Sequence, residues 1–198
     1  MGINHSLILG NAAVAITLVL SIYTLWCIWK GTVKPHIFSV LIWFLLTSIA
    51  FFNMLLEQNA GAAAYRTGFM ALMLLLNVLI SSYKNGFGYI RKSDWYFLIG
   101  SLAVIPIWLV SQSADLALFL LLVVEVVGTI PTFTKAYHHP YDLSPGIYGI
   151  TALAQFLQLM SLLVSGHTYG VVLVLYMTSF PLLFMGLTAL LVVRRREI

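Results

Sequence analysis

One acidic residue, Glu125, lies in the middle of a long apolar run of the sequence. The run covers residues 116–137, so about ten residues separate Glu125 from either end. Ionisable groups inside a membrane are costly and usually face a cavity or a polar partner. Glu125 could therefore take up and release a proton, or act as the counter-ion of a cationic solute. The alternative is a protonated side chain that only hydrogen-bonds a neighbouring helix.

Two other apolar segments, 37–56 and 146–165, carry rows of polar and aromatic side chains. The rows consist of Ser39, Trp43, Thr47 and Asn53 in the first segment, and of Ser144, Tyr148, Thr151, Gln155 and Gln158 in or beside the second. Spacings of three and four place most members of a row on one face of a helix. Such rows can simply hold helices together, at roughly 0.6 kcal/mol per contact.

The same rows predict the walls of a central pocket for a solute, because a few convergent polar groups in an apolar lining are typical of small-molecule sites. Trp43 and Tyr148 would be paired aromatic platforms, and Asn77 and Thr178 would close the pocket from two further segments. The predicted solute-binding residues are Trp43, Asn53, Asn77, Tyr148, Gln155, Gln158 and Thr178.

Two residues near Glu125 are candidates for a hinge. Pro131 removes one backbone hydrogen bond from a helix and kinks it, and Gly128 adds local freedom. A kink of this kind can allow one part of a protein to rock against another, or it can be static. No nucleophile–base pair, metal-ligand cluster or phosphate-binding loop is visible, so we expect no enzymatic reaction, no metal site and no cofactor.

The composition restricts the elements that can position these residues. Of 198 residues, 61% are hydrophobic and only 8% are charged, whereas a soluble domain has about 25% charged residues. A soluble enzyme, a nucleic-acid binder, a disordered chain and a disulfide scaffold are all poor interpretations, and Cys27 is the single cysteine. We therefore predict an all-α polytopic membrane protein.

Seven segments are apolar enough to cross a bilayer, which requires about 20 residues per helix. They are 7–29, 37–56, 65–83, 95–110, 116–137, 146–165 and 169–193. The loops between them are short, so residues 1–198 are predicted to form a single transmembrane domain. The expected partners are the lipid bilayer, a small-molecule solute and a second copy of the chain, with no nucleic acid.

Basic residues indicate the orientation of the chain, because cytoplasmic loops are enriched in Lys and Arg. Nine of the ten fall on one side of the predicted membrane, with Arg66 as the exception. The N-terminus is therefore expected outside and the C-terminus in the cytoplasm. Short loops without a targeting signal fit a bacterial inner membrane. The nine residues are Lys30, Lys34, Lys84, Arg91, Lys92, Lys135, Arg194, Arg195 and Arg196.

A weak internal repeat appears at an offset of 105 residues. It pairs Lys30 with Lys135, Pro35 with Pro140, Ser39 with Ser144, Trp43 with Tyr148 and Asn53 with Gln158. The repeat predicts two parallel three-helix units, 7–83 and 116–193, joined by a linker helix at 95–110. Parallel repeats of this kind bracket a site near the membrane midplane, and they rock around it in alternating access.

The second unit resembles the PQ-loop motif of the SWEET, SemiSWEET and PQ-loop transporter superfamily. The matching residues run from Gly128 through Pro131 to Tyr137, followed by Pro140, Leu143 and Ser144. Two departures matter: Thr132 stands where the family has Gln, and Trp26 takes the place of the Pro in the first unit. The resemblance implies the same 3+1+3 arrangement. Some families with a similar layout are receptors, such as the KDEL receptor, and PnuC-type vitamin transporters share it.

Two functions follow from these observations. The first is a transporter or facilitator of a small polar organic solute, coupled to protons through Glu125. The second is a membrane receptor or sensor that binds a ligand without moving it. Aromatic and amide side chains suit sugars, nucleosides or vitamins, whereas a midplane carboxylate suits an amine.

Overall fold

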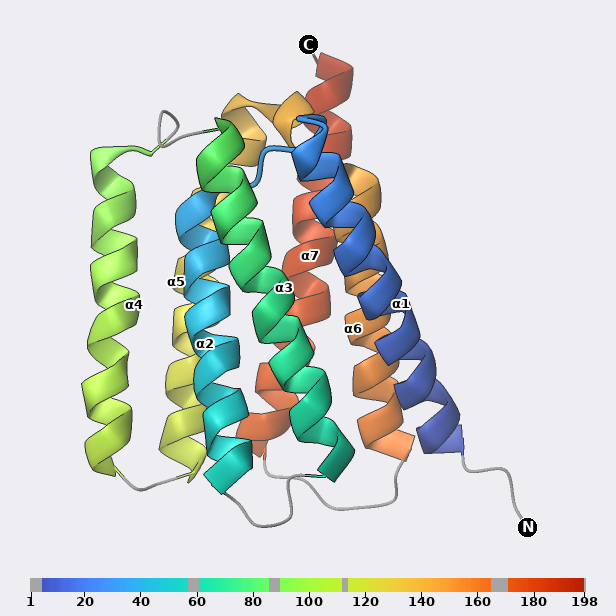
Figure 1. Ribbon diagram of the computed structural model, residues 1–198, viewed down its shortest axis with the longest axis vertical. Helices are drawn as coiled ribbons and strands as arrows, with labels where there is room; N and C mark the ends of the chain where they lie inside the picture. The colour runs from blue at the N-terminus through green and yellow to red at the C-terminus, as the bar shows by residue number, and fades with distance from the viewer. Residues whose placement is uncertain (1–4, 57–60, 86–89, 112–113, 165–170, 198) are drawn as a thin grey trace.

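The computed structural model describes residues 5–56, 61–85, 90–111, 114–164 and 171–197 (Figure 1). Within these ranges the chain forms α-helices and one short 3-10 helix, and no β-strand. The elements are α1 His5–Trp29, α2 Ile37–Leu56, α3 Gly61–Asn85, α4 Lys92–Ser111, α5 Ala114–His138, η1 Pro140–Asp142, α6 Pro145–Val164 and α7 Val171–Glu197.

Within the described residues, five helices are long and apolar enough to cross a membrane, namely α1, α3, α5, α6 and α7, and α2 contains a shorter apolar stretch. Successive helices run in alternating directions (Figure 1), so α1, α3, α5 and α7 end on the same side of the molecule. The nine basic residues that were predicted to lie on one side of the membrane are found at this end, at helix ends and in the short connections. We call it the basic end of the molecule.

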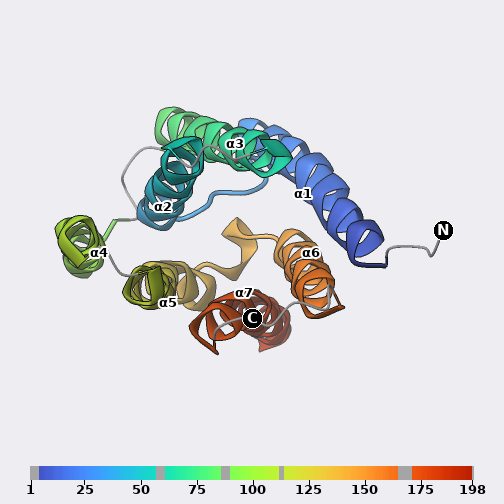
Figure 2. The ribbon, with the colours of Figure 1, turned by 90° about the horizontal axis from the view of Figure 1, so that it is seen from below.

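The helices form a ring around a central axis (Figure 2). α3 packs against both α1 and α2, and α7 packs against both α5 and α6. The ring closes through two further contacts, α1 with α6 and α2 with α5. α4 stands outside the ring and packs on α5 and α2.

The start and end of several helices follow from local sequence. Gly31, with φ of 75°, ends α1: its N–H donates to the Ile28 carbonyl, and the Thr32 N–H donates to the Cys27 carbonyl. This is the pattern that favours glycine after a helix. α6 begins with a proline at its first position, preceded by Ser144, whose hydroxyl oxygen accepts a hydrogen bond from the Ile147 N–H at 3.4 Å.

Among the helices that extend beyond their predicted limits are α7 and α5. α7 continues through Arg194, Arg195 and Arg196 to Glu197, although the three arginines were expected to follow the last helix. Arg195 Nε donates to the Pro140 carbonyl at 3.1 Å, which ties this extension to η1. Cations also interact favourably with the negative end of a helix dipole. α5 likewise continues one residue beyond the predicted segment 116–137, to His138, and the Lys135 side chain near this end is buried.

The contacts between the two sides of the ring are closely packed. Buried Ile147 of α6 joins a cluster with Cys27 and Ile28 of α1. On the opposite side, Gly128 of α5 lies so close to Ile42 of α2 that an added Cβ would stand 2.9 Å from Ile42 Cγ2. The outward surfaces remain apolar, as expected where a protein meets lipid.

Candidate functional site

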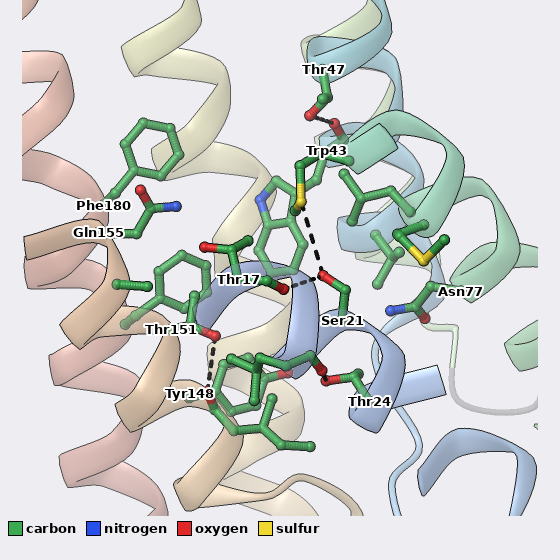
Figure 3. A pocket seen from close by; sticks show the side chains of 18 of the residues that line it. Thr17, Ser21, Thr24, Trp43, Thr47, Asn77, Tyr148, Thr151, Gln155 and Phe180 are labelled. Carbon is green, nitrogen blue, oxygen red and sulfur yellow. Dashed lines mark hydrogen bonds between the residues drawn. The ribbon is translucent and has the colours of Figure 1, made fainter. Parts of the chain in front are cut away.

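A cavity of about 360 Å³ lies inside the ring (Figure 3). Side chains from six helices line it, and α4 contributes none among the described residues. A volume of this size is at the lower end of the range for small-molecule sites. In Figure 3, Asn77 of α3 and Gln155 of α6 lie on opposite sides of the cavity, with Trp43 of α2 between them.

Glu125 contributes the charge-bearing group of the cavity wall. The residue is 2% exposed, and within the described part of the chain its Oε1 atom has no hydrogen-bond partner. Trp43 is the polar neighbour of this carboxyl group across the α2–α5 contact, yet Trp43 Nε1 also lacks a partner. A buried acceptor and a buried donor are thus both unpaired, and each costs free energy until a ligand or water satisfies it.

Aromatic side chains form one wall of the cavity. Phe184 of α7 joins Trp43 and Tyr148, with ring centroids 5.7 Å from the first and 6.0 Å from the second. Further along α7, Tyr176 and Phe180 make an edge-to-face pair at 4.9 Å. Trp43 and Tyr148 are therefore linked through a third ring that the sequence analysis did not identify.

Hydroxyl groups supply much of the remaining polar lining, beside Leu, Val, Ile and Met side chains. The row on α1 was missed, although its spacing of four and three residues was visible in the sequence. Each of these hydroxyls donates its proton within its own helix, at 2.7–2.8 Å, to the carbonyl of the residue four positions earlier. The residues are Thr17, Ser21 and Thr24 on α1, Thr47 on α2 and Thr151 on α6.

The structure brings together most of the predicted site residues. Those that line the cavity are Trp43, Asn77, Tyr148, Gln155 and Glu125. Asn53 lies in α2, but its side chain is outside the described residues. The prediction thus identified residues of four different helices that share one cavity.

Thr178 and Gln158 are not among the described lining residues of this cavity, and their role in binding a solute stays a prediction. Thr178 donates to the Val174 carbonyl at 2.7 Å. α7 presents Tyr176 and Phe180 to the cavity, and a residue two positions from either points to the opposite side of the helix, because each residue turns the helix by about 100°. Gln158 continues the row on α6 one turn beyond the lining residue Gln155.

The two candidate hinge residues have clear packing roles. Gly128 is a point of close approach between α5 and α2, opposite Ile42. Pro131, one turn later, is fully buried and lines a second, smaller cavity of about 150 Å³ near the basic end. Their role as a hinge remains a prediction.

The second cavity contains a buried polar pair that the sequence analysis missed. His36 Nε2 lies 3.1 Å from Asp94 Oδ2, and the two side chains are 3% and 4% exposed. Burial lowers the pKa of His36, and the neighbouring Asp94 partly opposes this shift. No local pattern relates these residues, because they lie 58 positions apart in the sequence.

Within the described part of the chain, no group of three or more His, Cys, Asp or Glu side chains could hold a metal ion. No protein-family model, curated protein or solved structure matches this chain. The function must therefore be argued from the cavity and from the helices that enclose it.

Proposed function

We propose that this chain is a membrane transporter that moves a small polar organic solute by alternating access. The observation that carries the proposal is the position of the cavity. It lies between the three-helix group α1–α2–α3 and the three-helix group α5–α6–α7, and both groups supply its lining. A site shared by two such groups is accessible from alternate sides when one group rocks against the other.

The packing of the helices supports two parallel repeats joined by α4. The pairs α1 and α5, α2 and α6, and α3 and α7 have lengths of 25 and 25, 20 and 20, and 25 and 27 residues. In each group the third helix packs between the other two. Rotation by half a turn about the ring axis exchanges the α2–α5 contact with the α6–α1 contact. These pairings support the proposal of a 3+1+3 arrangement similar to that of the SWEET and PQ-loop superfamily.

The distribution of charge supports an orientation with the basic end, and therefore the C-terminus, in the cytoplasm. We propose the bacterial inner membrane as its location, because the predicted spans leave only short loops between them. Glu125 would couple transport to protons, because its carboxyl group is the ionisable side chain that faces the cavity from α5.

Uptake by proteoliposomes tests this proposal. Vesicles that contain the full chain are incubated with a panel of labelled sugars, nucleosides, vitamins and amines in the outer medium, under an imposed pH gradient. We expect uptake of at least one solute above that of empty vesicles, and loss of its pH dependence in Glu125→Gln. Saturable binding without any uptake would instead establish the receptor alternative. Uptake with unchanged pH dependence would remove Glu125 from proton coupling.

A further inference from the structure

We infer that the solute is a small organic cation whose ammonium group binds Glu125, and that protons compete with it for the same carboxyl group. This inference rests on the proposed function, since it names the class of solute for the same cavity. The charges, the unpaired hydrogen-bonding atoms and the aromatic groups of the described lining support it.

The first observation is an unbalanced charge. Among the described lining residues, Glu125 is the one carboxyl group, and no Lys, Arg or His side chain lines the cavity. A buried carboxylate without a partner is strongly disfavoured. The group must therefore hold a proton or receive a positive charge from the solute.

The second observation is the geometry of the unpaired atoms. Glu125 Oε1 is buried and has no hydrogen-bond partner among the described residues. An ammonium group carries several N–H donors and forms a charge-assisted hydrogen bond with a carboxylate. A cation that binds here satisfies the acceptor and balances its charge at once, whereas a neutral polyol satisfies only the acceptor.

The third observation is that the hydroxyl groups of α1 in the cavity wall can only accept hydrogen bonds from a ligand. Each hydroxyl of Thr17, Ser21 and Thr24 has already donated its proton to a backbone carbonyl of α1. What remains of each hydroxyl is an acceptor lone pair. This wall of the cavity therefore favours a ligand with N–H or O–H donors and offers little to a carboxylate or a phosphate.

The fourth observation is the aromatic wall. Trp43 is a polar neighbour of Glu125, and it stands in a connected set of rings with Phe184 and Tyr148. The electron-rich faces of aromatic rings attract cations, with Trp the strongest of the three. Tyr176 lies within electrostatic range of the Glu125 carboxyl group from α7, so aromatic groups approach the charge from two helices.

The size of the cavity limits the cation. A volume of about 360 Å³ holds about a dozen water-sized groups, at roughly 30 Å³ each. A single-ring amine or a short-chain quaternary ammonium ion fits within this limit.

Binding to the purified full chain, measured by isothermal titration calorimetry at pH 7.5, tests the inference. Two matched pairs of probes differ in charge but little in shape: choline with 3,3-dimethylbutan-1-ol, and 2-phenylethylamine with 2-phenylethanol. We expect at least one cation to bind at least tenfold more tightly than its neutral partner. Equal affinity within both pairs, or binding of neither cation, would overturn the inference.

Variants then assign the effect to the carboxyl group. Glu125→Gln should lower the affinity for the bound cation at least tenfold and leave that for its neutral partner within twofold. The matched control Glu197→Gln, the same chemical change at an exposed residue of α7, should bind like the parent. If Glu125→Gln does not fold, Glu125→Asp retains the charge, and the comparison of probes on the parent protein stands without any variant.

Competition with protons gives a separate readout. Cation affinity should fall as the medium is made more acidic in the parent protein, and it should become independent of pH in Glu125→Gln. Retention of the pH dependence in that variant would refute the competition.

Transport of choline separates this inference from the proposed function. Choline has no neutral form that leaks through the bilayer. Glu125-dependent binding of choline without uptake would reject transport but retain the class of ligand. Conversely, uptake of a neutral sugar that Glu125→Gln leaves unchanged would support transport and reject the organic cation.

Discussion

Lys34 and Asp142 connect the two short segments that precede α2 and α6. The Lys34 N–H donates to the Asp142 carbonyl at 2.6 Å, and Lys34 Nζ lies 3.4 Å from Asp142 Oδ1. The buried ammonium of Lys135 lies 3.9 Å from the second carboxyl oxygen. These contacts join the two halves of the ring at the basic end, so we expect them to open when that end of the cavity opens.

The first prediction concerns Asp142→Asn, which removes the negative charge between the two lysines. We expect the free energy of unfolding to fall by about 2 kcal/mol, because the change leaves the buried Lys135 ammonium without its counter-charge. Thermal unfolding in detergent measures the effect. The control is Glu197→Gln, which breaks the exposed ion pair between Glu197 and Arg194. There we expect the free energy of unfolding to fall by less than about 0.5 kcal/mol. Equal losses in the two variants would contradict a special role for Asp142.

The second prediction concerns Gly128, where α5 and α2 approach closely. In Gly128→Ala the new Cβ would stand 2.9 Å from Ile42 Cγ2, inside a fully packed contact. Overpacking of this kind costs about 1–3 kcal/mol, and alanine's higher helix propensity offsets up to about 1 kcal/mol of it. We therefore expect a lower midpoint of thermal unfolding.

Gly100 on α4 provides the control for this substitution, because an added Cβ there meets no heavy atom within 4 Å. Gly100→Ala should leave the midpoint unchanged or raise it. Ile42→Ala removes the methyl group that obstructs the new Cβ. It should therefore lower the midpoint of thermal unfolding less in the Gly128→Ala variant than in the parent protein. Additive effects of the two changes would argue against a direct contact.

The third prediction concerns a reciprocal pair of hydrogen bonds between α1 and α6. Ser6 Oγ donates to the Ser161 carbonyl, and Ser161 Oγ donates to the Ser6 carbonyl, each at 2.7 Å. Ser161→Ala should lower the free energy of unfolding by about 0.6–1 kcal/mol, a typical value for a hydrogen bond between membrane helices. Ser48→Ala is the control, because the Ser48 hydroxyl bonds only the Phe44 carbonyl of its own helix. A smaller loss for Ser161→Ala than for Ser48→Ala would contradict the prediction.

The fourth prediction is a dependence of stability on pH that arises from His36. Its pKa is lowered in the folded protein because burial disfavours the charged imidazole. The unfolded chain therefore binds more protons as the pH falls below the ordinary value of about 6.5. Stability should decrease in that range, by at most about 1.4 kcal/mol per pH unit, until the lowered pKa of the folded state is passed.

Thermal unfolding of the parent and of His36→Gln between pH 8 and pH 5 measures this contribution. The variant should show a shallower decrease than the parent, since its side chain does not titrate. His138→Gln changes an exposed histidine at the end of α5 and should retain the slope of the parent. Identical slopes in all three proteins would show that His36 does not control the acid response.

Much of the architecture could be predicted from the sequence because the bilayer imposes one simple requirement. A spanning segment must satisfy its own backbone hydrogen bonds and be apolar over about 20 residues. The limits of α2 match the predicted segment at both ends, and those of α6 differ from it by one residue at each end. Glu125 stood out by itself, since a single carboxyl group in an apolar run is conspicuous whatever surrounds it.

The tertiary structure decided which face of each helix points inward. In a membrane helix the outward face is as apolar as a packed core, so periodicity does not distinguish them. From the sequence, Thr178 is the predicted binding residue of the last helix, whereas α7 presents Tyr176, Phe180 and Phe184 to the cavity. For the same reason the sequence does not single out the hydroxyl groups of α1 that line it. The His36–Asp94 pair depends on the placement of α4 against the ring, a long-range contact that no local pattern encodes. Residue types thus determined the helices and the charge, and packing determined the cavity that brings them together.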